Sequence, residues 1–295
     1  MLELIGISTY SLFGQLLVGL INGAFYAILS LGLAVIFGLL NIINFTHGAQ
    51  YMMGAFAAWM MLNYLGMGYW PALVAGPVIV ALTGIAIERS MISKLYRVDH
   101  LYGLLLTFGI GLIITGIFRN YYGSAGLPYP VPDVFQGGID LGFMYLPVYR
   151  LWVICASALV CLATWLVIEK TKLGAYLRAA TENPSLVEAF GINVPRLMTL
   201  TYGFGAWLAA MAGVLAAPMY SVNPNMGIDL LIVVFAVVVI GGMGSIAGAI
   251  VTGFALGLIE GLTKVFYPEA SSTVIFVVMA IVLLVRPAGL FGKVA

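Results

Sequence analysis

Residues 11–39 read SLFGQLLVGLINGAFYAILSLGLAVIFGL, and no Asp, Glu, Lys or Arg occurs anywhere between Leu4 and Ile87. A charged side chain at the centre of a membrane helix costs roughly 2.5–3.5 kcal/mol on insertion scales. A charge-free stretch several membrane widths long therefore indicates that hydrocarbon is the surrounding solvent. The composition agrees, because 63% of the 295 residues are hydrophobic and only 8% are charged. The chain is predicted to be an integral membrane protein.

Polar residues and Pro/Gly breaks divide the rest of the chain into similar apolar runs. A bilayer core needs about 20 apolar residues per helix, which gives roughly eight to ten spans. The expected spans are residues 11–39, 45–65, 70–87, 101–118, 148–168, 197–217, 230–240, 246–262 and 273–285. The first is long enough to be tilted, or broken near Asn22-Gly23. These runs predict an all-α polytopic transmembrane bundle, formed as a single domain over residues 1–295.

Basic residues set the orientation of the bundle. They gather in three regions: Arg89, Lys94 and Arg97; Lys170, Lys172, Arg178 and Arg196; and Arg286 and Lys293. The positive-inside rule places these regions in the cytoplasm and residues 119–149 outside, as an irregular loop containing several prolines. An even number of crossings must then separate Arg196 from the tail. We expect residues 230–262 to form two short helices that turn at residues 241–245, as a hairpin or a partial re-entrant element.

The longest polar stretch is the loop at residues 169–196. Asn183 followed by Pro184 is typical of a helix start, and Gly191 suits the position after a helix end, which predicts a short cytoplasmic helix. Charged side chains on this segment are Arg178, Glu182 and Glu188. The helix is either a connector on the membrane surface or a docking element for a cytoplasmic partner, with Phe190 as its anchor.

Polar side chains also occur inside the charge-free region. They are Asn41, Asn44, Thr46 and His47, followed by Gln50. Unpaired polar groups are costly in lipid, so these side chains must contact protein or water. They indicate a polar patch beside a translocation path or a broken helix at membrane depth. The alternatives are a short turn at the membrane surface or hydrogen bonds between helices.

Small residues recur every four positions near the end of the chain. They are Gly244 and Gly248, then Gly253, Gly257 and Gly261. This spacing is typical of close helix packing and favours it over ligand contact. Glu260 and Lys264 lie four residues apart near the end of the same run, and we interpret them as an exposed pair at the membrane interface or, alternatively, as including a pore-facing carboxylate.

Several motifs are absent from the sequence. It has no G-x-x-x-x-G-K-[ST] phosphate loop, no catalytic constellation and no signature of nucleic-acid binding. A metal site at His47 is not expected, because His100 is the only other histidine. Carboxylates inside the apolar runs are also scarce, which disfavours coupling to protons or sodium. Any energy source is expected on another subunit.

Five motifs along the chain together resemble one known family. They are NGAFYAILSLG (residues 22–32), NFTHGAQYMMGA (44–55), RAATENP (178–184) continuing to Gly191-Ile192, IGGMGSIAGA (240–249) and RPAGLFG (286–292). In this order they resemble the LivH-type permease subunits of branched-chain amino-acid ABC importers. Each motif alone is moderately specific, but the five run from the first span to the last residues.

The resemblance implies a multi-pass permease of the bacterial inner membrane that is not itself an enzyme. It implies a second homologous permease subunit, two cytoplasmic ATPase subunits that carry ATP and Mg, and a periplasmic substrate-binding protein. It assigns the ATPase contact to the 169–196 loop, with Lys172, Arg178, Glu182, Asn183, Glu188, Phe190 and Gly191 as coupling residues. Outside, residues 121–149 and 220–227 would contact the binding protein.

The expected function is inward transport of branched-chain amino acids by alternating access, driven by the partner ATPases. The path would be lined by Asn41, Asn44, Thr46 and His47, and this chain would bind no cofactor of its own. Alternative cargoes for the same importer class are urea, amides and small aromatic acids. The alternative mechanism is a stand-alone channel for a small neutral solute; a membrane-embedded enzyme is disfavoured by the missing catalytic groups.

Overall fold

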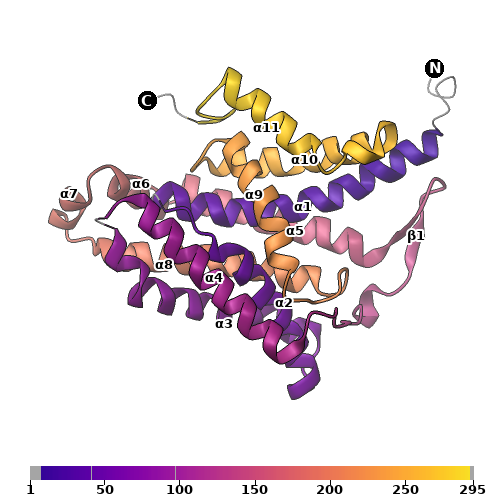
Figure 1. Cartoon of the computed structure of the whole chain (residues 1–295), viewed down its shortest axis with the longest axis horizontal. Coiled ribbons are helices and arrows are strands. Elements are labelled where there is room, and N and C mark those ends of the chain that lie inside the picture. Colours follow the sequence, from indigo (N-terminus) through magenta and orange to yellow (C-terminus); the bar gives the residue numbers. More distant parts are fainter. Residues whose placement is uncertain (1–7, 41, 97, 293–295) are drawn as a thin grey trace.

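The computed structural model describes residues 8–40, 42–96 and 98–292. Most of this length is helical, and its long helices run along the longest axis of the molecule (Figure 1). The helices are α1 Thr9–Leu40, α2 Thr46–Leu65, α3 Tyr69–Ser90, α4 His100–Tyr122, α5 Val148–Lys170, α6 Lys172–Glu182, α7 Pro184–Ala189, α8 Val194–Ala216, α9 Met226–Gly241, α10 Ile246–Phe266 and α11 Val274–Val285. Short 3₁₀ turns occupy Ile92–Leu95, Asp133–Phe135 and Pro268–Ala270. The predicted polytopic helical bundle is confirmed.

All nine expected spans form helices, but they differ in length. Within the described residues, six helices are long and apolar enough to cross a membrane, namely α1, α3, α4, α5, α8 and α10. The apolar helices α9 and α11 have 16 and 12 residues. At 1.5 Å per residue they extend about 24 and 18 Å, less than the roughly 30 Å of a hydrocarbon core. The bundle therefore combines full-length helices with shorter ones.

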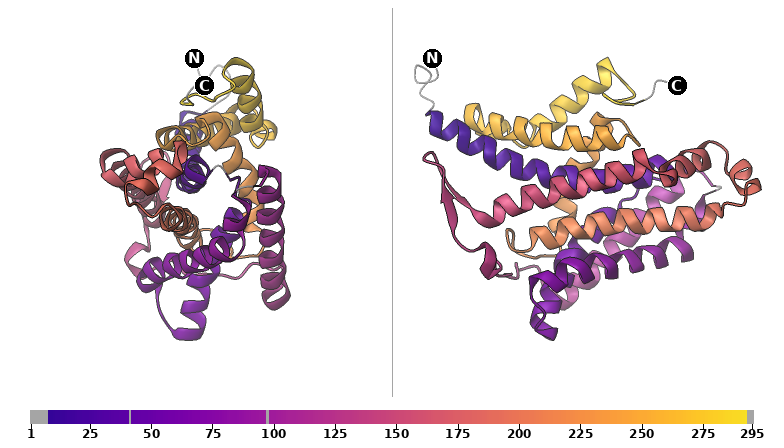
Figure 2. Two further views of the ribbon diagram at one scale, coloured as in Figure 1. Left: turned by 90° about the vertical axis from the view of Figure 1, so that its left-hand side faces the viewer. Right: turned by 180° about the vertical axis from the view of Figure 1, so that it is seen from behind.

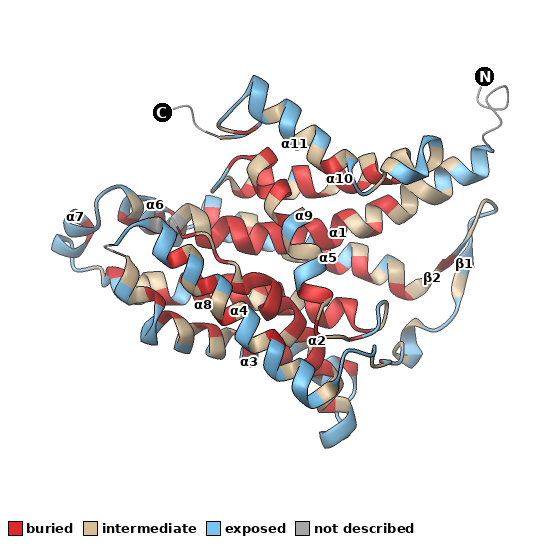
Figure 3. Ribbon diagram, in the orientation of Figure 1, coloured by how far each residue is buried: buried red, intermediate tan, exposed pale blue. Residues whose placement is uncertain are grey.

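The first helix, α1, is the centre of the bundle. It runs unbroken for 32 residues, so the break considered near Asn22-Gly23 is wrong. At this position α1 packs closely against α10, and a Cβ added to Gly23 would lie 3.0 Å from the Cα of Phe254 on α10. Most of α1 is buried by the rest of the chain, as the red interior in Figure 3 shows.

The contact between α1 and α10 depends on glycines from both helices. A Cβ on Gly257 would lie 2.4 Å from the carbonyl oxygen of Gly19 and from the backbone nitrogen of Gly23. Cβ atoms on Gly253 and Gly261 would come within 2.6 Å and 2.4 Å of the α1 backbone. Only residues without side chains allow this approach, because carbon atoms normally stay about 3.5–4.0 Å apart.

The turn expected at residues 241–245 separates α9 from α10. Gly242 and Gly244 have φ values of 98° and 85°, which favour glycine, and the Ser245 side chain accepts a hydrogen bond from the backbone nitrogen of Gly248 at 3.1 Å. Gly248 also packs on the Gly241 carbonyl. The expectation of two short helices is wrong for α10, which has 21 residues. The helix continues beyond residue 262 to Phe266, because Thr263 and Lys264 are both compatible with a helix.

The two ends of the bundle differ in structure. The helices α6 and α7 lie at one end, and the β-hairpin lies at the other (Figures 1 and 2). The hairpin pairs β1 Gly138–Asp140 with β2 Tyr145–Pro147 in antiparallel register, with Ile139 opposite Leu146. The segment expected outside is therefore partly ordered as a sheet, which corrects the expected irregular loop. A bridge between Leu127 and Val222 ties it to the α8–α9 connection.

Large apolar side chains remain exposed on the outer helices. The surfaces of α3, α4 and α5 carry many of them, including Val74, Leu105, Ile113 and Leu159. The buried residues gather on α1, α2 and α8 in the interior (Figure 3). An apolar surface of this extent is typical of a protein whose periphery contacts lipid or another membrane subunit.

Candidate functional site

The segment at residues 169–196, which was expected to be cytoplasmic, contains two helices rather than one. The expected short helix is α7: the Asn183 side chain accepts a hydrogen bond from the backbone nitrogen of Leu186 at 3.1 Å, Pro184 occupies the first turn, and Gly191 has a φ of 82°. The second helix, α6, was not predicted. It is held by packing of Gly174 on the Ile168 carbonyl.

One face of α7 is anchored to the chain and the other is free. Val187 is buried in a small cluster with Ala180 and Val194. Phe190 and Leu186, in contrast, are 77% and 54% exposed. The segment thus presents two large apolar side chains to its surroundings. Exposed apolar groups on an ordered element are typical of a surface that a partner covers.

The charged residues of this segment lie on its surface. Arg178 forms an ion pair with Glu169 at 3.4 Å and donates to the Ile168 carbonyl at 3.4 Å, which ties α6 to α5. Both side chains of the pair are nearly half exposed, so its contribution to stability is small. Lys172, Glu182 and Glu188 are exposed. The coupling role of these residues stays a prediction.

A second group of polar residues is buried at the start of α2. Asn44, Thr46, His47 and Gln50 are all at most 1% exposed. The Asn44 amide oxygen accepts hydrogen bonds from the Tyr202 hydroxyl at 3.2 Å and from the Thr46 backbone nitrogen at 3.1 Å. The Gln50 amide nitrogen donates to the Tyr202 hydroxyl at 3.3 Å. Hydrogen bonds between α8 and the start of α2 therefore organise this group, which agrees with the alternative of hydrogen bonds between helices.

The same group reaches α1 and α4. The Thr46 hydroxyl donates to the Thr107 carbonyl at 2.8 Å, and the His47 Nε2 atom lies 2.9 Å from the Leu29 carbonyl. The His47 Nδ1 atom is buried without a hydrogen-bond partner in the described part of the chain. Asn41 lies outside the described residues. No cluster of three or more His, Cys, Asp or Glu that could hold a metal occurs in residues 8–40, 42–96 and 98–292. The role of these residues in a substrate path stays a prediction.

A cavity of about 270 Å³ lies beside the α8–α9 connection, and we call it the outside cavity after the side of the membrane expected for this end of the bundle. Its wall includes residues from α1, α2, the α8–α9 connection and α9. Aromatic rings from Phe25, Tyr26, Tyr51 and Tyr220 supply much of this wall. The cavity is therefore a mixed aromatic and polar space between elements that are distant in sequence.

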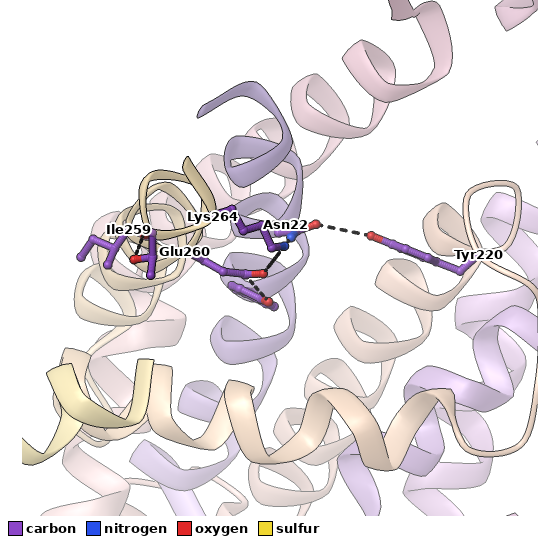
Figure 4. Close-up of polar contacts among 7 residues, drawn as sticks. Asn22, Tyr220, Ile259, Glu260 and Lys264 are labelled. Carbon is purple, nitrogen blue, oxygen red and sulfur yellow. Dashed lines mark hydrogen bonds and ion pairs between the residues drawn. The ribbon is translucent and has the colours of Figure 1, made fainter. Parts of the chain in front are cut away.

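The Glu260–Lys264 pair lies behind this cavity. The Lys264 ammonium is 2.6 Å from the Glu260 carboxylate, which also accepts hydrogen bonds from the Tyr26 hydroxyl at 2.8 Å and the Asn22 amide at 3.4 Å (Figure 4). Glu260 is only 7% exposed. The expectation of an exposed interfacial pair is therefore wrong, because the glycine contact brings α1 over the carboxylate. The Tyr220 hydroxyl approaches Asn22 from the opposite side at 3.5 Å.

Two glycines bring α9 and α2 together near this cavity. A Cβ on Gly227 would lie 2.0 Å from the Gly48 carbonyl oxygen, so α9 and α2 meet backbone to backbone. Both glycines line a void of about 10 Å³ beside His47, and this void shares Tyr51 and Leu230 with the larger cavity. The outside cavity and the buried polar group are thus neighbours.

A sequence model of the family described as "Branched-chain amino acid transport system / permease component" matches residues 15–283. The chain belongs to this permease family. It is 30% identical to the high-affinity branched-chain amino acid transport system permease protein LivH of Escherichia coli K12, over 95% of each chain. It is also 30% identical to BraD of Pseudomonas aeruginosa, over 96% of this chain and 97% of that protein.

The match identifies this protein as a LivH-type, multi-pass membrane permease of an ABC-type importer and not as an enzyme. LivM of E. coli is a more distant relative, 27% identical over 90% of this permease and 67% of that protein. Relatives of this permease thus carry the names of two different permease proteins of one transport system.

Some residues of the permease's candidate sites were missed by reasoning from sequence. Tyr202 lies in an apolar helix and gives no local sign of the hydrogen bonds that it makes to Asn44 and Gln50. Tyr26 was noted only within a motif, and Asn22 only there and as part of a possible helix break. A usable signal existed for Glu260, because a carboxylate within an apolar, glycine-rich run is rare and points to a buried partner.

Proposed function

We propose that this permease is the membrane-spanning subunit of an ATP-binding-cassette importer that moves branched-chain, hydrophobic amino acids into the cell. The family match and the names of the relatives support the cargo. The observation that carries the coupling mechanism is the ordered helix α7, with Phe190 and Leu186 exposed at the end of the bundle rich in Lys and Arg. A cytoplasmic ATPase would cover this surface.

The proposal includes partners that supply what the chain lacks. A second, related permease subunit would complete the membrane part, as the similarity to both LivH and LivM supports. Two cytoplasmic ATPases would bind ATP and Mg, since this sequence has no phosphate loop. A periplasmic binding protein would deliver the substrate. The assembly would lie in the bacterial inner membrane.

The transport cycle would connect the two candidate sites. Closure of the ATPases would move α6 and α7 together, because Val187 packs against Ala180 and Val194. That movement would reach α8, which begins at Val194 and carries Tyr202 into the buried polar group. Separation of Gly48 from Gly227 would then join the outside cavity to the Asn44, Thr46 and His47 group. Access would alternate as this contact opens and closes.

Reconstitution tests the proposal. Proteoliposomes would contain this permease with the permease, ATPases and binding protein encoded beside it, and uptake of labelled leucine would be measured with and without internal ATP. The expected result is uptake that requires ATP and every partner. Flux of a small solute through this chain alone would refute the mechanism, whereas ATP-dependent uptake of urea in place of leucine would refute only the cargo.

Two variants test the docking surface within the same assay. Phe190→Ala is expected to leave the protein inserted but to uncouple ATP hydrolysis from uptake. Phe266→Ala is the matched control, since Phe266 is 54% exposed at the other end of the bundle. Normal coupled transport by the Phe190 variant would contradict the assignment of α7 to the ATPase contact.

A further inference from the structure

The outside cavity is lined by both apolar and polar side chains. Phe25, Met226 and Leu230 form apolar parts of its lining, while Asp229 contributes a carboxylate. Its volume of about 270 Å³ is just below the roughly 300–1,000 Å³ of pockets for drug-sized ligands, so it suits a smaller molecule. A ligand that matches this lining has an apolar portion and a cationic group.

Asp229 is the free charge at this cavity. Its side chain is exposed, and in the described part of the chain it forms no hydrogen bond or ion pair. The second nearby carboxylate, Glu260, is already neutralised by Lys264 and holds the side chains of Tyr26 and Asn22 in the wall. One unpaired negative charge therefore remains to attract an ammonium group.

Hydroxyl groups supply the hydrogen-bond donors of the cavity. Tyr51 lines the cavity, and its hydroxyl makes no hydrogen bond within the described residues. Tyr220 makes only a long 3.5 Å contact to Asn22. A hydroxyl at the cavity wall that no protein group occupies can donate a hydrogen bond to a ligand. A carboxylate is such a ligand group.

The location of the cavity fits delivery from outside. Ser221 and Asn223 in the α8–α9 connection form part of its lining, and the neighbouring Val222 is paired with Leu127 of the outside segment. The void beside His47, which Gly48 and Gly227 line, shares Tyr51 and Leu230 with this cavity. A molecule in this cavity would therefore lie next to the buried polar group.

We propose that this cavity is the outer binding site for a zwitterionic amino acid with an apolar side chain. The ammonium group binds Asp229, the carboxylate accepts hydrogen bonds from the Tyr51 and Tyr220 hydroxyls, and the side chain contacts Phe25 and Met226. A neutral amide gains little from Asp229, and an organic acid without an amine is repelled by it. The inference rests on the proposed function for its choice of cargo, and it adds the site and the charge requirement.

Photolabelling tests the site without requiring transport. The assembled complex in detergent would be irradiated with a leucine analogue that carries a diazirine, and the labelled peptides would be mapped by mass spectrometry. Labelling of peptides that contain Tyr51 or Tyr220 is expected, with protection by excess leucine. Labelling of other peptides in the chain would overturn the proposal, and so would labelling that excess leucine does not reduce.

Substitution of Asp229 tests the charge requirement. Asp229→Asn is expected to weaken leucine protection and to raise the leucine KM for uptake roughly ten- to a hundredfold, the effect of losing a hydrogen bond to a charged group. Competition by 4-methylpentanoate, which is leucine without the amine, is expected to improve or stay unchanged. Glu269→Gln is the matched control, because Glu269 is an exposed carboxylate at the same end of the bundle.

The outcomes separate this inference from the proposed function. One outcome would overturn the site and leave the function. In it, the wild-type complex takes up leucine, and the Asp229→Asn variant has the same leucine KM and leucine protection as the Glu269→Gln control. Leucine-protected labelling of the cavity without ATP-dependent uptake would support the site and refute the function. Tyr51→Phe provides a second variant that changes no charge, and equal leucine protection in this variant and the wild type would refute the hydroxyl contact.

Discussion

The glycine contact between α1 and α10 makes a quantitative prediction for Gly257→Ala. The added Cβ would lie 2.4 Å from the Gly19 carbonyl oxygen and from the backbone nitrogen and Cα of Gly23. Carbon contacts are normally about 3.5–4.0 Å, so the two helices would have to separate by about 1 Å or more. Overpacking of this kind costs about 1–3 kcal/mol. Alanine is more favourable than glycine in a helix by roughly 0.5–1 kcal/mol, which offsets part of that cost.

We therefore expect Gly257→Ala to lower the free energy of unfolding by about 1–2 kcal/mol. Gly116→Ala on α4 is the matched control, because a Cβ there would meet nothing within 4 Å. The control keeps only the gain in helix propensity and should be as stable as the wild type or slightly more stable. The measurement is unfolding of the purified chain in mixed micelles with increasing SDS, followed by circular dichroism. Equal midpoints for the two variants would refute close packing at Gly257.

Three further substitutions test separate parts of the structure. Tyr202→Phe removes the hydroxyl that joins Asn44 to Gln50 and should cost about 1–3 kcal/mol in the same SDS assay, whereas an unchanged midpoint would contradict the network. Asn183→Ala removes the α7 cap and should cost about 1 kcal/mol locally, seen as faster hydrogen exchange in α7 with α8 unaffected; unchanged exchange would argue against the cap. Tyr129→Phe should be neutral or stabilising by about 1 kcal/mol, because the buried Tyr129 hydroxyl has no partner in the described residues, and a clear loss of stability would show that it does make a bond.

Much of the secondary structure could be predicted because it depends on neighbours along the chain. Continuous apolar runs predicted every long helix, and Asn183-Pro184 predicted the start of α7. The turn at residues 241–245 was evident from its glycines and from the requirement for an even number of crossings. Helix α6 was not predicted and was interpreted as a loop, because its apolar positions, such as Leu177, are spaced among polar residues.

The candidate sites could be predicted only in part. Polar side chains in a charge-free region are conspicuous, so Asn44, Thr46 and His47 were found from sequence. Tyr202, which completes their hydrogen bonds, was not found, because it lies 158 positions from Asn44. A tyrosine in an apolar helix is ordinary until its partner is known.

The sequence by itself determined that this chain is a helical membrane protein, which end of the bundle carries the basic loops, and to which permease family it belongs. These properties follow from hydrophobicity, charge distribution and ordered motifs, and none of them requires a distance between remote residues. Only the tertiary structure decided that Glu260 is buried against Tyr26, 234 positions away, and that an aromatic cavity with a free carboxylate lies beside them. Close glycine packing brings these groups together, and spacing along the chain does not reveal which helices will meet.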